Sequence, residues 1–141
     1  MALRLWRWII VLLLIGYSII SLGIPVRALL FNIRGGVEEV SAPMMDLIAS
    51  MQWIQIIAWL TALLFYLLAA LCLGMARRRA MTFAVAGAVL DIGQWASLKY
   101  GGDAYNIAFS SGQQAFDYSL FGFLAIIVGS IWVMVRRGAL R

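Results

Sequence analysis

The chain has 141 residues, of which 65% are hydrophobic and 12% charged, and its mean hydropathy is +0.96. A soluble domain carries about 25% charged residues, so this composition excludes a soluble globular protein and predicts one membrane-embedded domain, residues 1–141. The net charge is +5, but the arginines stand at the ends of apolar runs, where membrane topology requires them. We therefore expect no nucleic-acid binding.

Histidine is absent, and Cys72 is the single cysteine. Without histidine the chain lacks the commonest metal ligand and the commonest general base, and a lone cysteine cannot form an intramolecular disulfide. The sequence also contains no phosphate-binding loop and no nucleophile elbow. We therefore expect no metal, no cofactor and no enzymatic activity.

Four apolar runs are long enough to cross a bilayer, which takes about 20 residues as a helix. A backbone exposed to lipid must satisfy its own hydrogen bonds, so each run should be helical. The expected spans are residues 5–24, 51–76, 80–100 and 116–135. The predicted fold is an all-α membrane protein, a bundle of four transmembrane helices.

The arginines predict how these spans are oriented, because cytoplasmic flanks of membrane helices are rich in Lys and Arg. Eight of the eleven cations fall on one side if every run crosses, in groups around Arg4, Arg78 and Arg137. We therefore predict a multi-pass protein of a bacterial inner membrane with both termini cytoplasmic. Five of these arginines are also expected to contact anionic lipid headgroups. They are Arg77, Arg78, Arg79, Arg136 and Arg137.

The loops on the opposite side are longer than simple connections. Apolar residues recur at helical spacing from Val26 to Ile33, which predicts a short helix at the outer membrane surface, ended by Gly35 and Gly36. Ser41 is a plausible start for the helix that follows. The second loop, residues 101–115, is polar but contains aromatic side chains, and we expect a folded cap.

Asp91 stands near the middle of the third span, where an acid costs about 2.5–3.5 kcal/mol on insertion scales. It should therefore face protein or water and have a polar partner. At 3.6 residues per turn, it shares one helix face with Gln94, Trp95 and three small residues that permit close helix packing. The small residues are Ala84, Gly87 and Ala88. In the fourth span a similar seam is expected to pack against the third span or another subunit. It consists of Ser119, Gly122, Ala125 and Gly129.

Matching helix depths predicts an intramembrane polar site around Asp91 and Gln94, because polar side chains of the first two spans lie at the same levels. They are Tyr17, Ser18 and Thr61 at the level of Asp91, and Ser21 and Gln55 at the level of Gln94. A protonated Asp91 bonded to such a partner would be a structural lock. An ionised Asp91 with access to water would be a proton or cation site.

Two deep tryptophans leave a similar choice open. Trp59 and Trp95 either fill space between helices or line a cavity for a lipophilic cation, since indole faces attract cations.

The favoured functional interpretation is a protein that acts by binding. It would be an accessory or scaffolding subunit, packed against other membrane subunits or against itself, because small-residue seams are present and a catalytic constellation is not. The alternative is a small proton- or cation-coupled transporter with Asp91 as the coupling acid. In size and number of spans the chain resembles the small multidrug resistance transporters, whose essential membrane acid is a glutamate of the first helix. Here the first span has no acid, and Asp91 lies in the third.

Overall fold

The computed structural model describes residues 2–35 and 41–140, which form seven helices and no strand. The helices are α1 (Ala2–Ser21), α2 (Gly23–Arg34), α3 (Ala42–Ser50), α4 (Trp53–Gly74), α5 (Arg79–Tyr100), α6 (Ala104–Ala108) and α7 (Ser111–Arg136). Gly36, predicted to help end the outer helix, and Arg141, one of the eight cations assigned to the cytoplasmic side, lie outside the described residues.

Four helical segments are long and apolar enough to cross a membrane, which confirms the all-α class and agrees with the number of predicted spans. Helices α4 and α5 match the second and third predicted spans closely. The first segment is longer than predicted, because α2 continues α1 and the two together run from Leu3 to Arg34. The fourth is also longer, because α7 already begins at Ser111.

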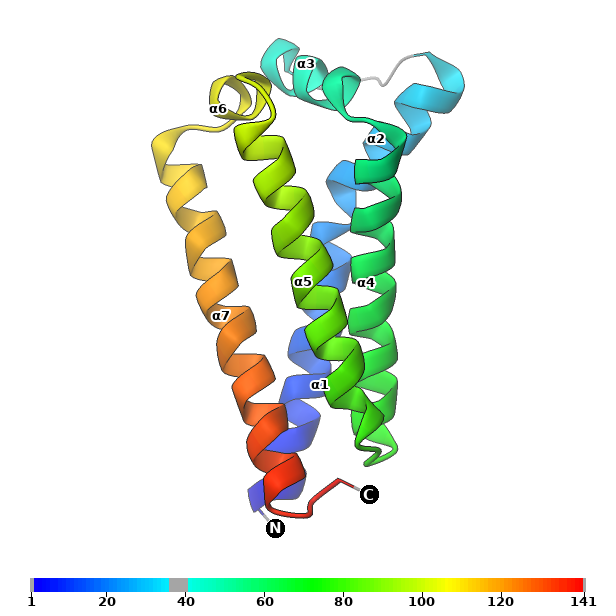
Figure 1. Cartoon of the computed structure of the whole chain (residues 1–141), viewed down its shortest axis with the longest axis vertical. Helices are drawn as coiled ribbons and strands as arrows, with labels where there is room; N and C mark the ends of the chain where they lie inside the picture. Colours follow the sequence, from blue (N-terminus) through cyan, green and yellow to red (C-terminus); the bar gives the residue numbers. More distant parts are fainter. Residues whose placement is uncertain (1, 36–40, 141) are drawn as a thin grey trace.

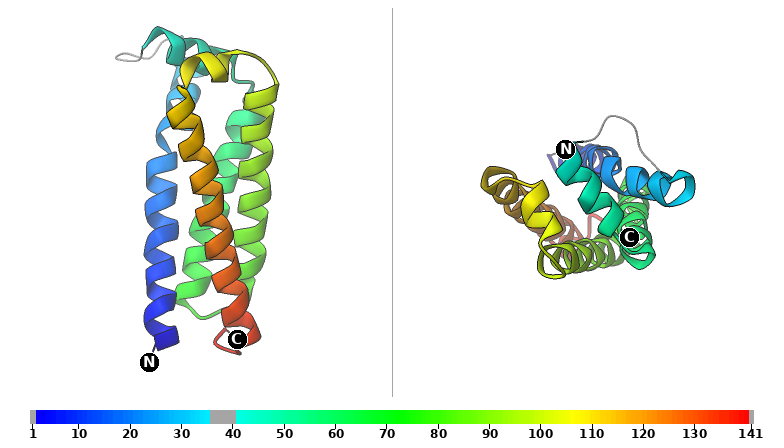
Figure 2. Two further views of the ribbon diagram at one scale, coloured as in Figure 1. Left: turned by 90° about the vertical axis from the view of Figure 1, so that its left-hand side faces the viewer. Right: turned by 90° about the horizontal axis from the view of Figure 1, so that it is seen from above.

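The long helices stand side by side in the order α1, α4, α5, α7 around the bundle (Figures 1 and 2). Both termini and the turn at Arg78 lie at one end, here called the arginine end (Figure 1). Helices α3 and α6 lie across the other, the capped end, where α3 packs against α2 and α6. The termini thus share one side, as predicted, and which side of the membrane that is stays a prediction.

A bend separates α1 from α2 at Leu22. Pro25 follows closely, and proline has no N–H to donate to the carbonyl of Ser21 and clashes with it, which bends a helix at this point. Beyond the bend, α2 leans away from α7, so the two helices diverge toward the capped end (Figure 1). Residues 26–33 are helical, but as part of α2. Their position at a membrane surface stays a prediction.

Two of the predicted helix boundaries, at Gly35 and at Ser41, agree with the structure. Gly35 ends α2 in the left-handed conformation, at φ 75°, and its N–H donates to the carbonyl of Phe31. Ser41 is extended and precedes α3, whose first turn contains a proline. The second loop folds, as expected, into the short helix α6, and α7 follows it almost at once.

The interior divides into two apolar clusters. The larger fills the arginine end of the bundle, with side chains such as Leu14, Leu73 and Ile131 that are fully buried. The smaller lies under the caps, where Leu47 and Ile48 of α3 meet Ile56 of α4. Of the polar residues predicted to form a site, Tyr17 belongs to the larger cluster, and Trp95 packs against the smaller one.

The two predicted small-residue seams face different neighbours. Ala84 and Gly87 are buried between α5 and α4, whereas Ala88 is only half-buried. The α7 seam is not buried in the bundle, because all four of its residues are exposed: Ser119, Gly122, Ala125 and Gly129. Ala125 and Gly129 line an open groove together with Ala88 and Ile92 of α5. Buried contacts of α7 come instead from side chains such as Leu124 and Ile127. The α7 seam is thus left for lipid or another subunit.

Candidate ligand-binding cavity

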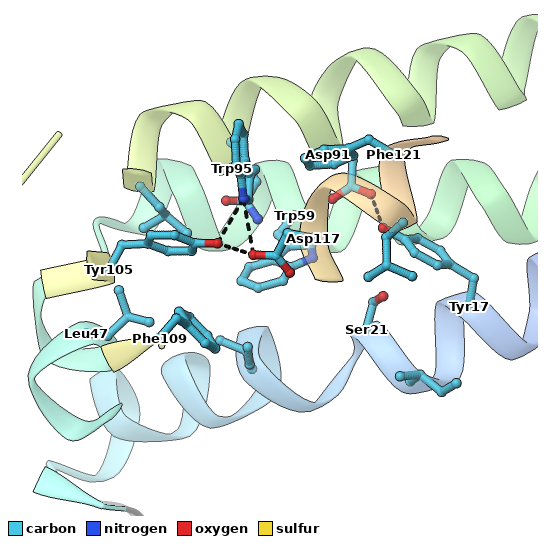
Figure 3. Close-up of a pocket in the computed structure, with 15 residues that line it drawn as sticks. Tyr17, Ser21, Leu47, Trp59, Asp91, Trp95, Tyr105, Phe109, Asp117 and Phe121 are labelled. Carbon is cyan, nitrogen blue, oxygen red and sulfur yellow. Dashed lines mark hydrogen bonds between the residues drawn. The ribbon is translucent and has the colours of Figure 1, made fainter. Parts of the chain in front are cut away.

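A cavity of about 180 Å³ lies between the two apolar clusters, and every helix contributes to its wall (Figure 3). Asp91, Gln94 and Trp95 line it from α5, Trp59 from α4 and Asp117 from α7. The wall is completed by Tyr17, Ile20, Ser21, Ile24, Leu47, Leu98, Tyr105, Phe109, Leu120 and Phe121. Ile20 of α1 also lines the cavity and is 81% exposed.

Asp91 is held at this wall by two tyrosines. The Tyr17 hydroxyl donates to Asp91 Oδ2 at 2.5 Å, and the Tyr66 hydroxyl donates to the same oxygen at 3.2 Å. The two phenol rings meet edge to face, with centroids 5.4 Å apart. The carboxyl is 4% exposed, so these donors offset part of the cost of removing it from water.

Depth matching identified Tyr17 as a partner of Asp91 but chose the wrong residue on α4. Thr61 lies at the expected level, but its hydroxyl donates to the carbonyl of Ile57 in its own helix. The Cα of Tyr66 lies more than one helical turn nearer the arginine end than that of Thr61. Its side chain is long, and helical side chains lean toward the N-terminus of their helix, which for α4 is the direction of Asp91.

The other predicted polar residues do not all meet. Ser18 donates to the carbonyl of Leu14, one turn earlier in α1. Gln55 Nε2 donates to the hydroxyl of Ser97 at 2.7 Å rather than to Gln94. Gln94 Oε1 is buried and has no hydrogen-bond partner, and the same holds for Trp59 Nε1. Two residues that line the cavity therefore each have a buried polar atom without a partner, one an acceptor and the other a donor.

A second polar cluster, which the sequence did not predict, joins three elements at the capped end of the cavity. Tyr105 of α6 donates its hydroxyl to Asp117 Oδ2. Trp95 Nε1 donates to the Tyr105 hydroxyl at 3.0 Å and lies 3.4 Å from the same carboxyl oxygen (Figure 3). Burial, and then the bond to Asp117, raise the pKa of Tyr105, so its hydroxyl keeps the proton that it donates.

The predicted fourth span, residues 116–135, would put Asp117 at a helix N-terminus, where an acid is stabilising. The structure instead begins α7 at Ser111, which places Asp117 beyond the first turn. Lys99 lies near the end of α5, at the capped end. Its ammonium donates to the Tyr118 hydroxyl and sits 4.9 Å and 4.4 Å from the ring centres of Trp95 and Tyr118.

The charged groups of the wall are all acidic. Asp91 and Asp117 both line the cavity, and no lysine or arginine does so within residues 2–35 and 41–140. In that part of the chain no cluster of three His, Cys, Asp or Glu residues could hold a metal ion. The groups that can contact a ligand are thus two carboxyls, an amide, hydroxyls and aromatic rings.

The arginines predicted to contact lipid lie far from this cavity, at the opposite end. Arg77, Arg78 and Arg79 are exposed in the turn before α5, and Arg136 and Arg137 are exposed at the end of α7. Arg78 Nε donates to the carbonyl of Leu140 at 3.1 Å, and the Arg136 guanidinium lies 4.9 Å from the ring centre of Trp132.

Comparison with protein-family models, curated proteins and solved structures finds no match for the chain. The function is therefore inferred from the cavity and its surroundings.

Proposed function

We propose that this membrane protein acts by binding a small molecule in the cavity beside Asp91. The observation that carries the proposal is a cavity with two carboxyls among its lining residues, two of which, Gln94 and Trp59, each have a buried polar atom without a hydrogen-bond partner. A buried polar group without a partner costs about 1–3 kcal/mol, and such groups in native structures call for a partner from outside the chain. A ligand with one donor and one acceptor would satisfy both.

The shape of the bundle supports entry from one side only. Toward the capped end α1 and α2 diverge from α7, and exposed Ile20 stands at the edge of the cavity. Toward the arginine end the interior is closed by packed side chains. If the arginine end is cytoplasmic, as the positive-inside rule predicts, the ligand enters from the outer half of the bilayer.

Asp91 stands where cavity and packed core meet, since its partners Tyr17 and Tyr66 belong to the core cluster. This position supports the coupled-transport alternative. An acid at the floor of a one-sided cavity is placed to bind a proton or a cation before the core opens. Transport would require the closed half to open, whereas binding requires the described conformation alone.

A role as accessory subunit of a bacterial inner-membrane complex is a further candidate, beside ligand binding and coupled transport. The exposed α7 seam favours it, because small residues on a lipid-facing helix allow the backbone of another helix to approach closely. In either case, the exposed arginines at the other end are placed to contact lipid headgroups.

Thermal unfolding of the purified protein with three small probes tests ligand binding. Benzylamine, benzyl alcohol and benzoate share one ring and differ in charge. A cavity of about 150 Å³ holds benzene, so probes of this size suit 180 Å³. Ser21→Phe fills the cavity, and Ser119→Phe adds the same ring on the exposed face of α7.

The proposal predicts that at least one probe raises the melting temperature of the wild type and of Ser119→Phe, but not of Ser21→Phe. It fails if no probe stabilises the wild type, or if Ser21→Phe is stabilised to the same extent.

A further inference from the structure

We infer that the ligand of this cavity is a protonated amine on a compact apolar or aromatic body. The inference rests on the proposed function and specifies the class of molecule that the same site takes. Three features of the wall lead to it: its charge, its unused acceptors and its aromatic rings. The cavity volume of about 180 Å³ limits the ligand to a compact one.

The charge of the wall calls for a cation. Two carboxyls, Asp91 and Asp117, face one cavity, and no lysine or arginine among the described residues lines it. Lys99 is the nearest basic residue along α5 and is already engaged with Tyr118 outside the cavity. A carboxyl in a low-dielectric site needs a partner of opposite charge or a proton. An ammonium ligand would supply both the charge and the donors.

The free acceptors match N–H groups. Both tyrosine hydroxyls donate to Oδ2 of Asp91, so neither uses Oδ1. Gln94 Oε1 is a second acceptor, on a side chain that is only 5% exposed, and it has no partner. An ammonium carries up to three donors and no acceptor, so it can bond to the carboxylate and the amide oxygen together. A carboxylate or phosphate ligand would leave both of these oxygens unpaired.

The walls suit the rest of such a ligand. Rings of Trp59, Trp95, Tyr105, Phe109 and Phe121 line the cavity (Figure 3). Aromatic faces attract ammonium groups by about 0.5–2 kcal/mol, depending on desolvation. The protein itself provides an example, because the Lys99 ammonium lies over the ring of Trp95. The unpaired Trp59 N–H could in addition bond to a hydroxyl or carbonyl of the ligand.

Matched probes test the charge of the ligand. Affinities of benzylamine and benzyl alcohol are measured by ligand-detected NMR titration, because the two differ only by an ammonium in place of a hydroxyl. In the wild type we expect benzylamine to bind about tenfold more tightly, the equivalent of 1.4 kcal/mol. In Asp91→Asn the preference should fall below about threefold while the affinity for benzyl alcohol is retained.

The matched control is Asp103→Asn, which removes an exposed acid outside the cavity and should keep the full preference. If Asp91→Asn does not fold, Asp117→Asn takes its place, with the same expected loss. Equal wild-type affinity for both probes, or tighter binding of benzoate, would overturn the amine inference and leave ligand binding intact. An undiminished preference in both cavity variants would overturn it as well. If neither probe binds, the proposed function itself fails.

Discussion

Substitution of Gly87 by alanine gives a sharp test of how the site is built. A Cβ at this position would lie 2.9 Å and 3.0 Å from Cε1 and Cδ1 of Tyr66, and 3.2 Å from the carbonyl oxygen of Ala62. Neither neighbour can give way easily. Tyr66 is fully buried, bonded to Asp91 and packed against Tyr17, and the carbonyl belongs to the α4 backbone.

The magnitude follows from three contributions. Overpacking costs about 1–3 kcal/mol, and loss of the Tyr66–Asp91 hydrogen bond costs about 1 kcal/mol. Alanine in place of glycine within a helix returns up to about 1 kcal/mol. The net loss of stability is about 1–3 kcal/mol, which for a chain of this size lowers the melting temperature by about 3–10 °C.

The assay is thermal unfolding in mild detergent, with Gly93→Ala as the control. Gly93 lies in the same helix, but nothing lies within 4 Å of a Cβ added there, so that variant should match or exceed the wild type. A Gly87→Ala protein as stable as Gly93→Ala would refute the close approach of α5 to Tyr66.

Three further outcomes follow from the same geometry. Tyr17→Phe should lower the melting temperature more than Tyr66→Phe, because its hydrogen bond to Asp91 is 2.5 Å rather than 3.2 Å; equal losses would contradict this order. Asp91→Asn should be nearly as stable as the wild type because the amide oxygen still accepts from both hydroxyls, whereas Asp91→Leu should be less stable by about 1–3 kcal/mol for each hydroxyl left unpaired. An Asn variant that is no more stable than the Leu variant would show that the hydroxyls need no acceptor. The predicted orientation places residue 103 outside the cell and residue 137 in the cytoplasm, so in intact cells a membrane-impermeant thiol reagent should label Asp103→Cys but not Arg137→Cys. The native Cys72 is buried and should give little background; the reverse pattern would overturn the predicted orientation.

The spans could be predicted because the bilayer imposes a simple rule on length and polarity. Because an acid in the membrane needs a polar partner, the same rule predicted a hydrogen-bond partner for Asp91, and Tyr17 was identified correctly. Tyr66 was missed because depth was judged from backbone level alone. A tyrosine hydroxyl lies about a helical turn from its own Cα, and its direction is set by the polarity of its helix.

The cavity itself was beyond prediction from the sequence. It depends on the bend near Pro25 and on how α3 and α6 close the capped end. Both caps are short helices from loops, and no periodic pattern fixes their packing. The bonds of Tyr105 to Asp117 and Trp95 arise only from that packing. The signal that was available, two deep indoles near an acid, did suggest a cavity for a cation as one of two interpretations.

The central claim is that a small ligand occupies the cavity between Trp59 and Asp91, and the indole N–H resonances of the six tryptophans test it most directly. On titration of the ¹⁵N-labelled protein with benzylamine, the Trp59 and Trp95 signals, assigned by Trp→Phe variants, should shift together and saturate. Signals of the tryptophans outside the cavity, Trp6, Trp8, Trp53 and Trp132, should remain in place. Shifts confined to those four, with Trp59 unmoved, would contradict the account.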